Sequence, residues 1–405
     1  MKIKECRICK ETKLKELFSF GNLCFTGKFP TKNQKIEKKP ITLVICKNCE
    51  LVQLGHSFNL KYLYGPDYGY RTGINKTMLN HVNKVVKNLS VKTKLKKNDF
   101  VLDIASNDGS LLKYYDKKIN TFGIDPILNK YKKEYKKINF KIADFFSAKK
   151  VTKFTKEKFK IITALSVFYD SEDPDKFIKD VKKLLSINGI FLLEFADLAS
   201  IIKFKMFDTI CHEHLEYYSS KVIINLCKKN NLKVFDIKQN DINGASKQYY
   251  ISHQDSTYKT NIKIINRVLN SEKKLNLSKE KTFKNFFKII NKSKIQLNKF
   301  LKNAKKLGKK VHGYGASTKG NVLLQYYKIN NTIVDFIAER NENKYNLFTP
   351  GTKIKIISEY LSRAYNPDYY LVLPWHFKKE ILLREKKIRR KGTKFIFPLP
   401  KLTII

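Results

Sequence analysis

The stretch FVLDIASNDGS, residues 100–110, decides how the middle of this chain folds. A short apolar run leads into small and polar residues, at the place where a strand would turn into a helix. Small residues in such a turn let the backbone approach a ligand closely. The stretch therefore predicts a strand, a nucleotide-binding turn and a helix.

Similar apolar runs alternate with helical segments on the C-terminal side of this stretch, which predicts a parallel sheet covered on both faces. A lysine-rich helical region, residues 258–308, then leads to a second alternating block. We expect two Rossmann-like α/β domains, at residues 71–240 and 241–405, after a small domain at residues 1–70. The runs are TFGIDP (121–126), NFKIAD (139–144), KIITALSVF (160–168) and GIFLLEFA (189–196), then KKVHGYGASTKGNVLLQYY (309–327), TIVDFIAE (332–339), DYYLVLP (368–374) and TKFIFPLP (393–400).

The small domain contains two C-x-x-C pairs, Cys6 with Cys9 and Cys46 with Cys49. Four thiolates fill every position around Zn²⁺ and leave none for a substrate, so the spacing predicts a structural zinc site. Seven cysteines are too few for a disulfide scaffold in 405 residues, which favours a reducing compartment. Cys24 has no partner in this pattern and is interpreted as an ordinary half-buried thiol.

The formal charge of +46 comes almost entirely from dispersed lysines. Nucleic-acid readers concentrate their basic residues, favour arginine and interleave aromatic residues, so we interpret the charge as solvated lysine faces and expect no specific nucleic-acid partner. No apolar run reaches the roughly 18 residues that span a membrane, and MKIKECRICK lacks the apolar core of a signal peptide. We expect a cytoplasmic monomer.

Asp103 precedes the turn after the first strand, and the turn lacks the pattern G-x-G-x-x-G. That pattern binds the pyrophosphate of a dinucleotide, so its absence favours S-adenosylmethionine, which has no pyrophosphate. Asp125, at the end of the next strand, is placed to accept from a ribose diol, and Asp144 from the adenine edge. An alternative is that Asp103 and Asp108 only cap the turn and the helix. The candidate cofactor residues are Asp103, Ala105, Ser106, Asn107, Asp108, Gly109, Asp125 and Asp144.

FDTICHEHLEYYS, residues 207–219, places two of the seven histidines around a carboxylate. Histidine changes protonation near neutral pH, so the segment is a candidate for acid–base chemistry. Structural hydrogen bonding is the alternative interpretation of His212 and His214. A metal site is less favoured because no third ligand lies at suitable spacing.

The order of these segments over nearly the whole chain resembles the three-domain sugar C-methyltransferases, which act on nucleotide-linked keto-deoxysugars. The resemblance implies a zinc-binding domain, a class I methyltransferase domain that binds S-adenosylmethionine, and a C-terminal α/β domain that closes the substrate cleft. It also implies methyl transfer to a carbon beside a ketone, in polysaccharide or glycoside biosynthesis.

The resemblance assigns His214 as the general base and Glu213 as an orienting or substrate-binding group. His212 is either catalytic or a brace for the base. A tyrosine of the family, thought to stabilise the enolate, is Cys211 here. We expect Tyr70 or Tyr217 to replace it.

Two further departures from the family lie around the substrate. Tyr169 stands where the family often has histidine, and Lys247 stands in place of an arginine, where it would make a non-bidentate phosphate contact. The resemblance also implies a substrate-side position for the Gly315 turn and Lys319, where the N–H groups of the following helix and the lysine charge could meet a phosphate. The alternative is a tight turn that packs between domains.

Two other functions stay open at this stage. One is an RNA methyltransferase that grips its substrate with the zinc ribbon and lysines, which would bind with a steep salt dependence. The other is a carbohydrate-cluster scaffold that has lost catalysis through the changes at Cys211 and Tyr169.

Overall fold

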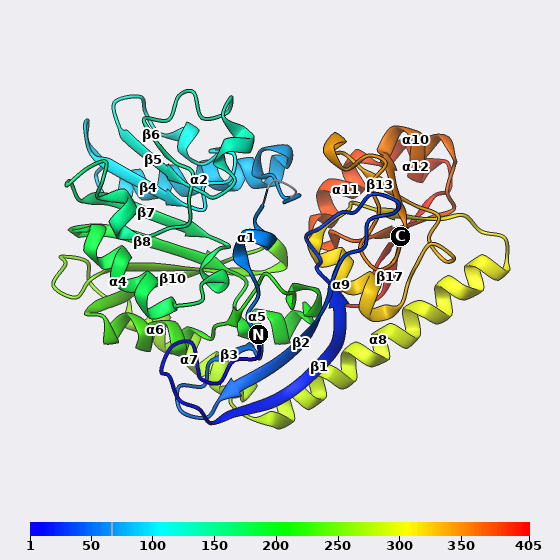
Figure 1. Ribbon diagram of the computed structural model, residues 1–405, viewed down its shortest axis with the longest axis horizontal. Coiled ribbons are helices and arrows are strands. Elements are labelled where there is room, and N and C mark those ends of the chain that lie inside the picture. The colour runs from blue at the N-terminus through cyan, green and yellow to red at the C-terminus, as the bar shows by residue number, and fades with distance from the viewer. Residues whose placement is uncertain (66–67) are drawn as a thin grey trace.

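The computed structural model describes residues 1–65 and 68–405 as an α/β protein with three sheets (Figure 1). Pro66 and Asp67, at the end of the expected first domain, lie outside the described residues. The first sheet is antiparallel, and its last strand comes from residues 207–219, which we call the HEH segment after His212, Glu213 and His214. Its strands are β1 (Leu14–Cys24), β2 (Lys38–Cys46), β3 (Val52–Leu54) and β9 (Glu216–Tyr217), in the order β1-β2-β3-β9.

The second sheet has seven strands in the order β10-β11-β8-β7-β4-β5-β6. The strands from β8 to β6 are parallel, whereas β11 is antiparallel to both of its neighbours. The expected boundary at residue 240 therefore falls inside the β10–β11 hairpin. We call the part of the chain that forms this sheet, through β11, the second domain, and the α/β part from residue 280 onward the third domain. The strands are β4 (Phe100–Ile104), β5 (Asn120–Ile124), β6 (Phe140–Ile142), β7 (Phe159–Leu165), β8 (Leu185–Phe195), β10 (Leu232–Asn240) and β11 (Ser246–His253).

Helices cover both faces of this sheet, as expected for buried parallel strands. α4 begins at a proline, with Asp173 as its N-cap accepting from the Lys176 N–H, and it ends where the buried strand β8 starts. The helices of this part are α1 (Leu60–Leu63), α2 (Lys76–Lys92), α3 (Ala148–Val151), α4 (Pro174–Leu184), α5 (Leu198–Phe204), α6 (Ser220–Lys229) and α7 (Ile262–Leu275).

The third sheet has the order β14-β13-β12-β15-β16-β17 and is parallel except for β17. Both Rossmann-like blocks expected from the sequence are therefore confirmed. The elements are α8 (Glu280–Lys306), β12 (Val311–Tyr314), α9 (Thr318–Tyr327), β13 (Phe336–Glu339), β14 (Lys355–Ser358), α10 (Glu359–Ala364), β15 (Tyr369–Val372), α11 (Lys378–Arg384), α12 (Lys386–Arg390), β16 (Lys394–Phe397) and β17 (Thr403–Ile404).

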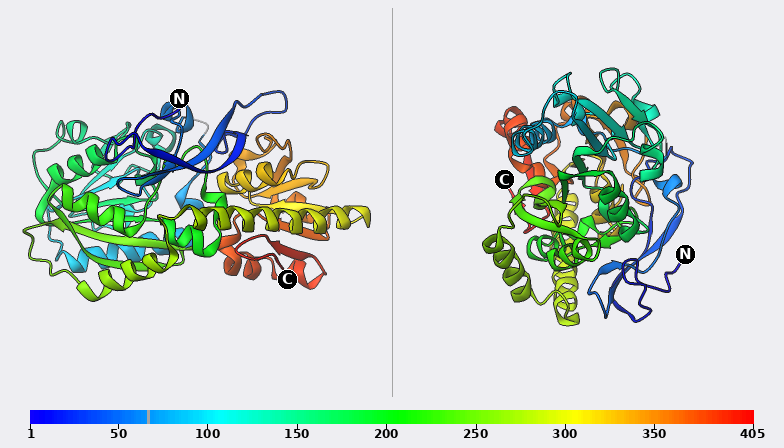
Figure 2. Two further views of the ribbon diagram at one scale, coloured as in Figure 1. Left: turned by 90° about the horizontal axis from the view of Figure 1, so that it is seen from below. Right: turned by 90° about the vertical axis from the view of Figure 1, so that its left-hand side faces the viewer.

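The β1–β2 hairpin ties the three parts together. Its far end meets α9, where the Gln325 side chain accepts from the Cys24 N–H (2.7 Å) and donates to the Cys24 carbonyl (3.1 Å). One apolar cluster joins the hairpin, α8 and the third sheet. The helix α8 runs from the hairpin along the third domain (Figure 2). Among the described residues, no helix combines the length and apolar character needed to cross a bilayer.

Candidate functional site

Four cysteine side chains converge at one end of the first sheet. The Sγ atoms of Cys6 and Cys49 are 3.5 Å apart, those of Cys9 and Cys46 are 3.4 Å apart, and all four lie within 4.8 Å of one another. A tetrahedral zinc with Zn–S bonds of 2.3 Å needs sulfur atoms about 3.8 Å apart, so the four residues fit the ion. Cys24 is buried and lies outside this cluster.

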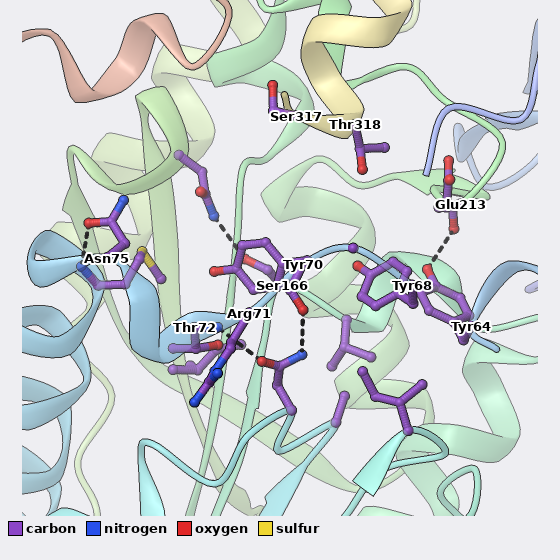
Figure 3. A pocket seen from close by; sticks show the side chains of 18 of the residues that line it. Tyr64, Tyr68, Tyr70, Arg71, Thr72, Asn75, Ser166, Glu213, Ser317 and Thr318 are labelled. Atoms are coloured by element: carbon purple, nitrogen blue, oxygen red, sulfur yellow. Dashed lines mark hydrogen bonds between the residues drawn. The ribbon is translucent and has the colours of Figure 1, made fainter. Parts of the chain in front are cut away.

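A cavity of about 520 Å³ lies where the second and third sheets face each other, and this volume suits a small-molecule substrate. The segment after α1, the carboxyl ends of the strands of the second sheet, and loops of the third domain all line it. Tyr64, Tyr68 and Tyr70 follow one another along the first of these segments, with Ser317 and Thr318 on the opposite side (Figure 3).

The loop after β4 forms one wall of this cavity. Asp125 accepts from the backbone N–H groups of Asn107 (2.8 Å) and Ile127 (2.8 Å), which fixes its carboxylate at the end of β5. Burial raises the pKa of Asp125 to about 6 and that of Asp103 to about 7. Asp103, Ala105, Ser106 and Asn107 all line the cavity, so this wall fits the cofactor that the sequence predicts.

Asp108 and Gly109, two other expected cofactor residues, lie behind the cavity wall. Asp108 accepts from the Gly73 N–H (3.0 Å) and from Arg71 Nε (3.2 Å), so it holds the segment before α2 against the cofactor loop. Asn107 does the same through the Thr72 N–H (2.9 Å). No local pattern of residues could reveal this clamp, because its two halves are about 35 residues apart.

Asp144 lines the cavity but is half exposed and forms an ion pair with Lys150 (2.8 Å). Glu194, near the end of β8, also lines the cavity and was missed from the sequence. Its carboxylate meets His81 Nε2 at 2.7 Å. A charged residue inside the apolar run GIFLLEFA was the signal that could have revealed it.

His214 is the histidine of the HEH segment that lines the cavity. Its Nδ1–H donates to the Thr209 carbonyl (2.7 Å), which leaves the Nε2 lone pair as the acceptor. The Tyr169 ring packs 4.2 Å from the imidazole, and Tyr169 also lines the cavity. Burial and the charge of Lys319 lower the pKa of His214 to about 3, so the ring is neutral at pH 7.

The other two members of the HEH segment have different surroundings. Glu213 borders the cavity, yet its carboxylate accepts from the Thr26 hydroxyl (3.0 Å) and from the Gly27 N–H (2.8 Å) of the β1–β2 connection. His212 is fully buried outside the cavity lining, and its Nε2 donates to the Lys39 carbonyl (3.0 Å). His212 therefore contacts strand β2 and does not reach the cavity.

Cys211 is fully buried and does not line the cavity. Tyr217, one of the two residues expected to replace the missing tyrosine, also lies outside the lining and donates its hydroxyl to the His214 carbonyl (2.9 Å). Tyr70, the other one, lines the cavity. Only Tyr70 of these two is therefore placed to reach a substrate.

The expectation that Lys247 contacts a phosphate is not supported by its position. Its ammonium donates to Asp197 (2.7 Å), Glu272 (2.8 Å) and the Ser220 hydroxyl (3.1 Å), away from the cavity. All three of its N–H donors are used, so none is left for a substrate. Both carboxylates are distant from Lys247 in the sequence, so no local pattern indicates these contacts.

The third domain places the turn after β12 on the cavity, with Gly315 and Lys319 in the lining. Gly315 has φ +82°, and a Cβ atom there would lie 2.6 Å from Pro374 Cγ, so both conformation and space require glycine. Ser317 caps α9 by accepting from the Gly320 N–H (3.0 Å). Glu339, at the end of β13, accepts from the Ala316 N–H (2.6 Å) and fixes the turn.

Comparisons with known proteins agree with this architecture. Family models match residues 6–64 ("Putative zinc binding domain"), 74–237 ("Methyltransferase domain") and 241–400 ("C-methyltransferase C-terminal domain"). The chain is 26% identical to the C-methyltransferase NovU of Streptomyces niveus, over 100% of this chain and 97% of the relative.

Two solved structures are also similar to part of the chain. One is an S-adenosylmethionine-dependent methyltransferase from Clostridium acetobutylicum ATCC 824, at 16% identity and a TM-score of 0.36, covering 43% of this chain and 92% of the other. The other is the CurJ carbon methyltransferase, at 12% identity and a TM-score of 0.35, covering 43% and 54%.

The four-cysteine cage, the sheet order and the family matches together define an S-adenosylmethionine-dependent methyltransferase with a structural zinc site. Because the three family models match in succession along the chain, it has the three-domain architecture of a C-methyltransferase, with a zinc-binding domain first.

Proposed function

We propose that the chain methylates a carbon beside the ketone of a nucleotide-linked keto sugar, as a cytoplasmic monomer in polysaccharide or glycoside biosynthesis. The resemblance to the sugar C-methyltransferases supports this substrate class. A single cavity bordered by the cofactor loop and by the loops of the third domain supports it as well, since one molecule could meet both walls.

The position of His214 is the observation that carries the proposal. A carbon acid beside a ketone needs a neutral base with a free lone pair, and the Thr209 carbonyl fixes the tautomer that presents Nε2. The depressed pKa keeps the ring neutral at physiological pH. General-base catalysis of this kind contributes roughly 10²- to 10⁴-fold.

The remaining residues position the reactants. S-Adenosylmethionine supplies an electrophilic methyl group, and Asp125 is placed to hold its ribose. The segment that carries Tyr70 is clamped to the cofactor loop and closes the same side of the cavity. Holding both reactants in line accounts for much of the remaining rate.

The test is to incubate the protein and S-adenosylmethionine with 4-keto-6-deoxy sugars linked to dTDP, UDP, GDP and CDP, and to read the products by mass spectrometry. A gain of one methyl group on the sugar supports the proposal. Exchange of the proton beside the ketone in D₂O should be lost in His214→Ala.

His253→Gln is a suitable control, because His253 bonds the Leu185 carbonyl (3.0 Å) and does not line the cavity. Normal exchange in His214→Ala would remove His214 as the base. Methyl incorporation into RNA, with no sugar in the panel methylated, would overturn the proposed substrate class.

A further inference from the structure

Lys319 is a cation that lines the cavity with most of its hydrogen-bonding capacity unused. It lies in the first turn of α9 and is half-buried. Its ammonium donates to the Asn243 carbonyl (3.2 Å), and within residues 1–65 and 68–405 it has no ion pair. An ammonium group has three N–H donors, so two remain for a ligand.

Other cations that line the cavity are already engaged. Carboxylates pair with the three arginines, and the Lys344 ammonium lies over the Phe29 ring, 4.4 Å from its centre, in addition to its carbonyl contact. These contacts are Arg71 with Asp108 and Glu134, Arg384 with Glu359 and Glu380, Arg340 with Glu380, and Lys344 with the Ala316 carbonyl.

The charge of Lys319 acts on the base. It is the second cause, after burial, of the lowered pKa of His214, and it also lowers the pKa of His376, which lines the same part of the cavity. The Asp208 carboxylate favours the charged form of Lys319, although burial lowers the pKa of this lysine. Helix α9, which carries Lys319, packs against residues 207–209, and Thr209 of that segment holds His214, so Lys319 and His214 line the same cavity.

Proton removal beside a ketone moves negative charge onto the ketone oxygen, which needs a donor close by. The thiol of Cys211 is buried outside the cavity lining, and the Tyr217 hydroxyl is used by the His214 carbonyl. The Tyr70 hydroxyl lines the cavity, but it is a neutral donor because burial raises its pKa to about 12. Among the described residues that line the cavity, Lys319 is the cation without a carboxylate or ring partner.

We infer that Lys319 is a catalytic residue whose ammonium donates to the ketone oxygen of the substrate and stabilises the enolate. The inference rests on the proposed function. In the step, His214 Nε2 takes the proton, and the C–H electron pair forms a C=C bond as the carbonyl electrons move onto oxygen, beside Lys319. The carbon then forms a bond to the methyl group, the C–S electron pair leaves with sulfur, the C=O bond re-forms, and the imidazolium returns its proton to water.

This role is more specific than the substrate-side position that the resemblance implied, and it differs from a contact with a phosphate. A phosphate contact would act on binding of any nucleoside diphosphate, whether or not a ketone is present. An oxyanion contact acts only when charge develops, so it changes kcat and proton exchange with little change in binding.

The experiment compares wild type, Lys319→Met and Lys319→Arg with the same sugar panel. We expect Lys319→Met to lower kcat and D₂O exchange by roughly 10²- to 10³-fold, the usual effect of removing one oxyanion donor. Affinity for dTDP, UDP, GDP and CDP, measured by calorimetry, should stay within threefold, and Lys319→Arg should restore part of the exchange. Lys306→Met, which removes an exposed charge at the end of α8, is the control.

Exchange within threefold of wild type in Lys319→Met would overturn the inference, as would a parallel loss of nucleoside diphosphate affinity. Bound S-adenosylmethionine and an unchanged circular dichroism spectrum establish that the variants are folded. If the wild type methylates no sugar of the panel, the proposed function itself fails. If the wild type and Lys319→Met are equally active, only the inference about Lys319 fails.

Discussion

Lys247→Met is expected to destabilise the second domain strongly while leaving substrate recognition intact. The Lys247 ammonium lies between Asp197 and Glu272, with side chains 6%, 0% and 5% exposed. Methionine fills similar space but leaves two buried carboxylates without their cation. Breaking a buried ion pair from one side costs about 3–5 kcal/mol.

Native-state hydrogen exchange, followed by mass spectrometry of peptides from β8 and β11, measures this loss locally. A cost of about 3–5 kcal/mol makes local opening roughly 10²- to 10⁴-fold more frequent, because each 1.4 kcal/mol is a factor of ten. Local measurement is preferred because a chain with several domains does not unfold in a single step.

Lys179→Met provides the matched control. Lys179 pairs with Asp175 at 2.7 Å, but its side chain is 62% exposed, and exposed pairs contribute about 0–1 kcal/mol. Equal exchange rates in the two variants would refute the structural account of Lys247. A folded Lys247→Met protein with a raised KM for the nucleotide sugar would restore its role as a phosphate contact.

Three further outcomes follow from the site and the zinc cage. Cys49→Ser, or chelation of zinc, should unfold the first domain, seen as loss of bound zinc and of exchange protection in β1 and β2, whereas Cys24→Ser should keep the metal. Asp125→Asn should weaken S-adenosylmethionine binding by about tenfold in calorimetry, because one hydrogen bond is impaired. The affinity of the wild type should fall as the pH drops through about 6, where Asp125 takes up a proton. An affinity independent of pH would contradict this. Burial lowers the pKa of His312 to about 4, so the ring stays neutral in the fold while the unfolded chain binds a proton below about pH 6.5. Stability therefore falls as the pH is lowered from about 6.5 to about 4, by up to about 1.4 kcal/mol per pH unit. The free energy of local opening of β12, measured by hydrogen exchange, should depend less steeply on pH in His312→Gln.

The local features of the chain were accessible from sequence because each depends on residues close together. The C-x-x-C pairs predict a tetrahedral cage, and the apolar run before Asp103 predicts a buried parallel strand followed by a ligand-binding turn. The alternation of such runs predicted both Rossmann-like domains. None of these inferences needed a contact between distant segments.

The roles within the HEH segment were decided by tertiary structure. Its neighbouring residues diverge because Lys39 holds His212, the β1–β2 connection holds Glu213, and Thr209 turns His214 toward the cavity. Periodicity along the chain does not specify such partners.

The sequence by itself determined the zinc cage, the two α/β domains and the loop that is placed to hold the cofactor, since local spacing and periodicity specify them. Only the fold removed Lys247 from the cavity and brought Lys319 and His214 into the lining of one cavity. The physical reason is that the function of a charged side chain depends on its burial and on the charges around it. Both are set by segments far away in the chain.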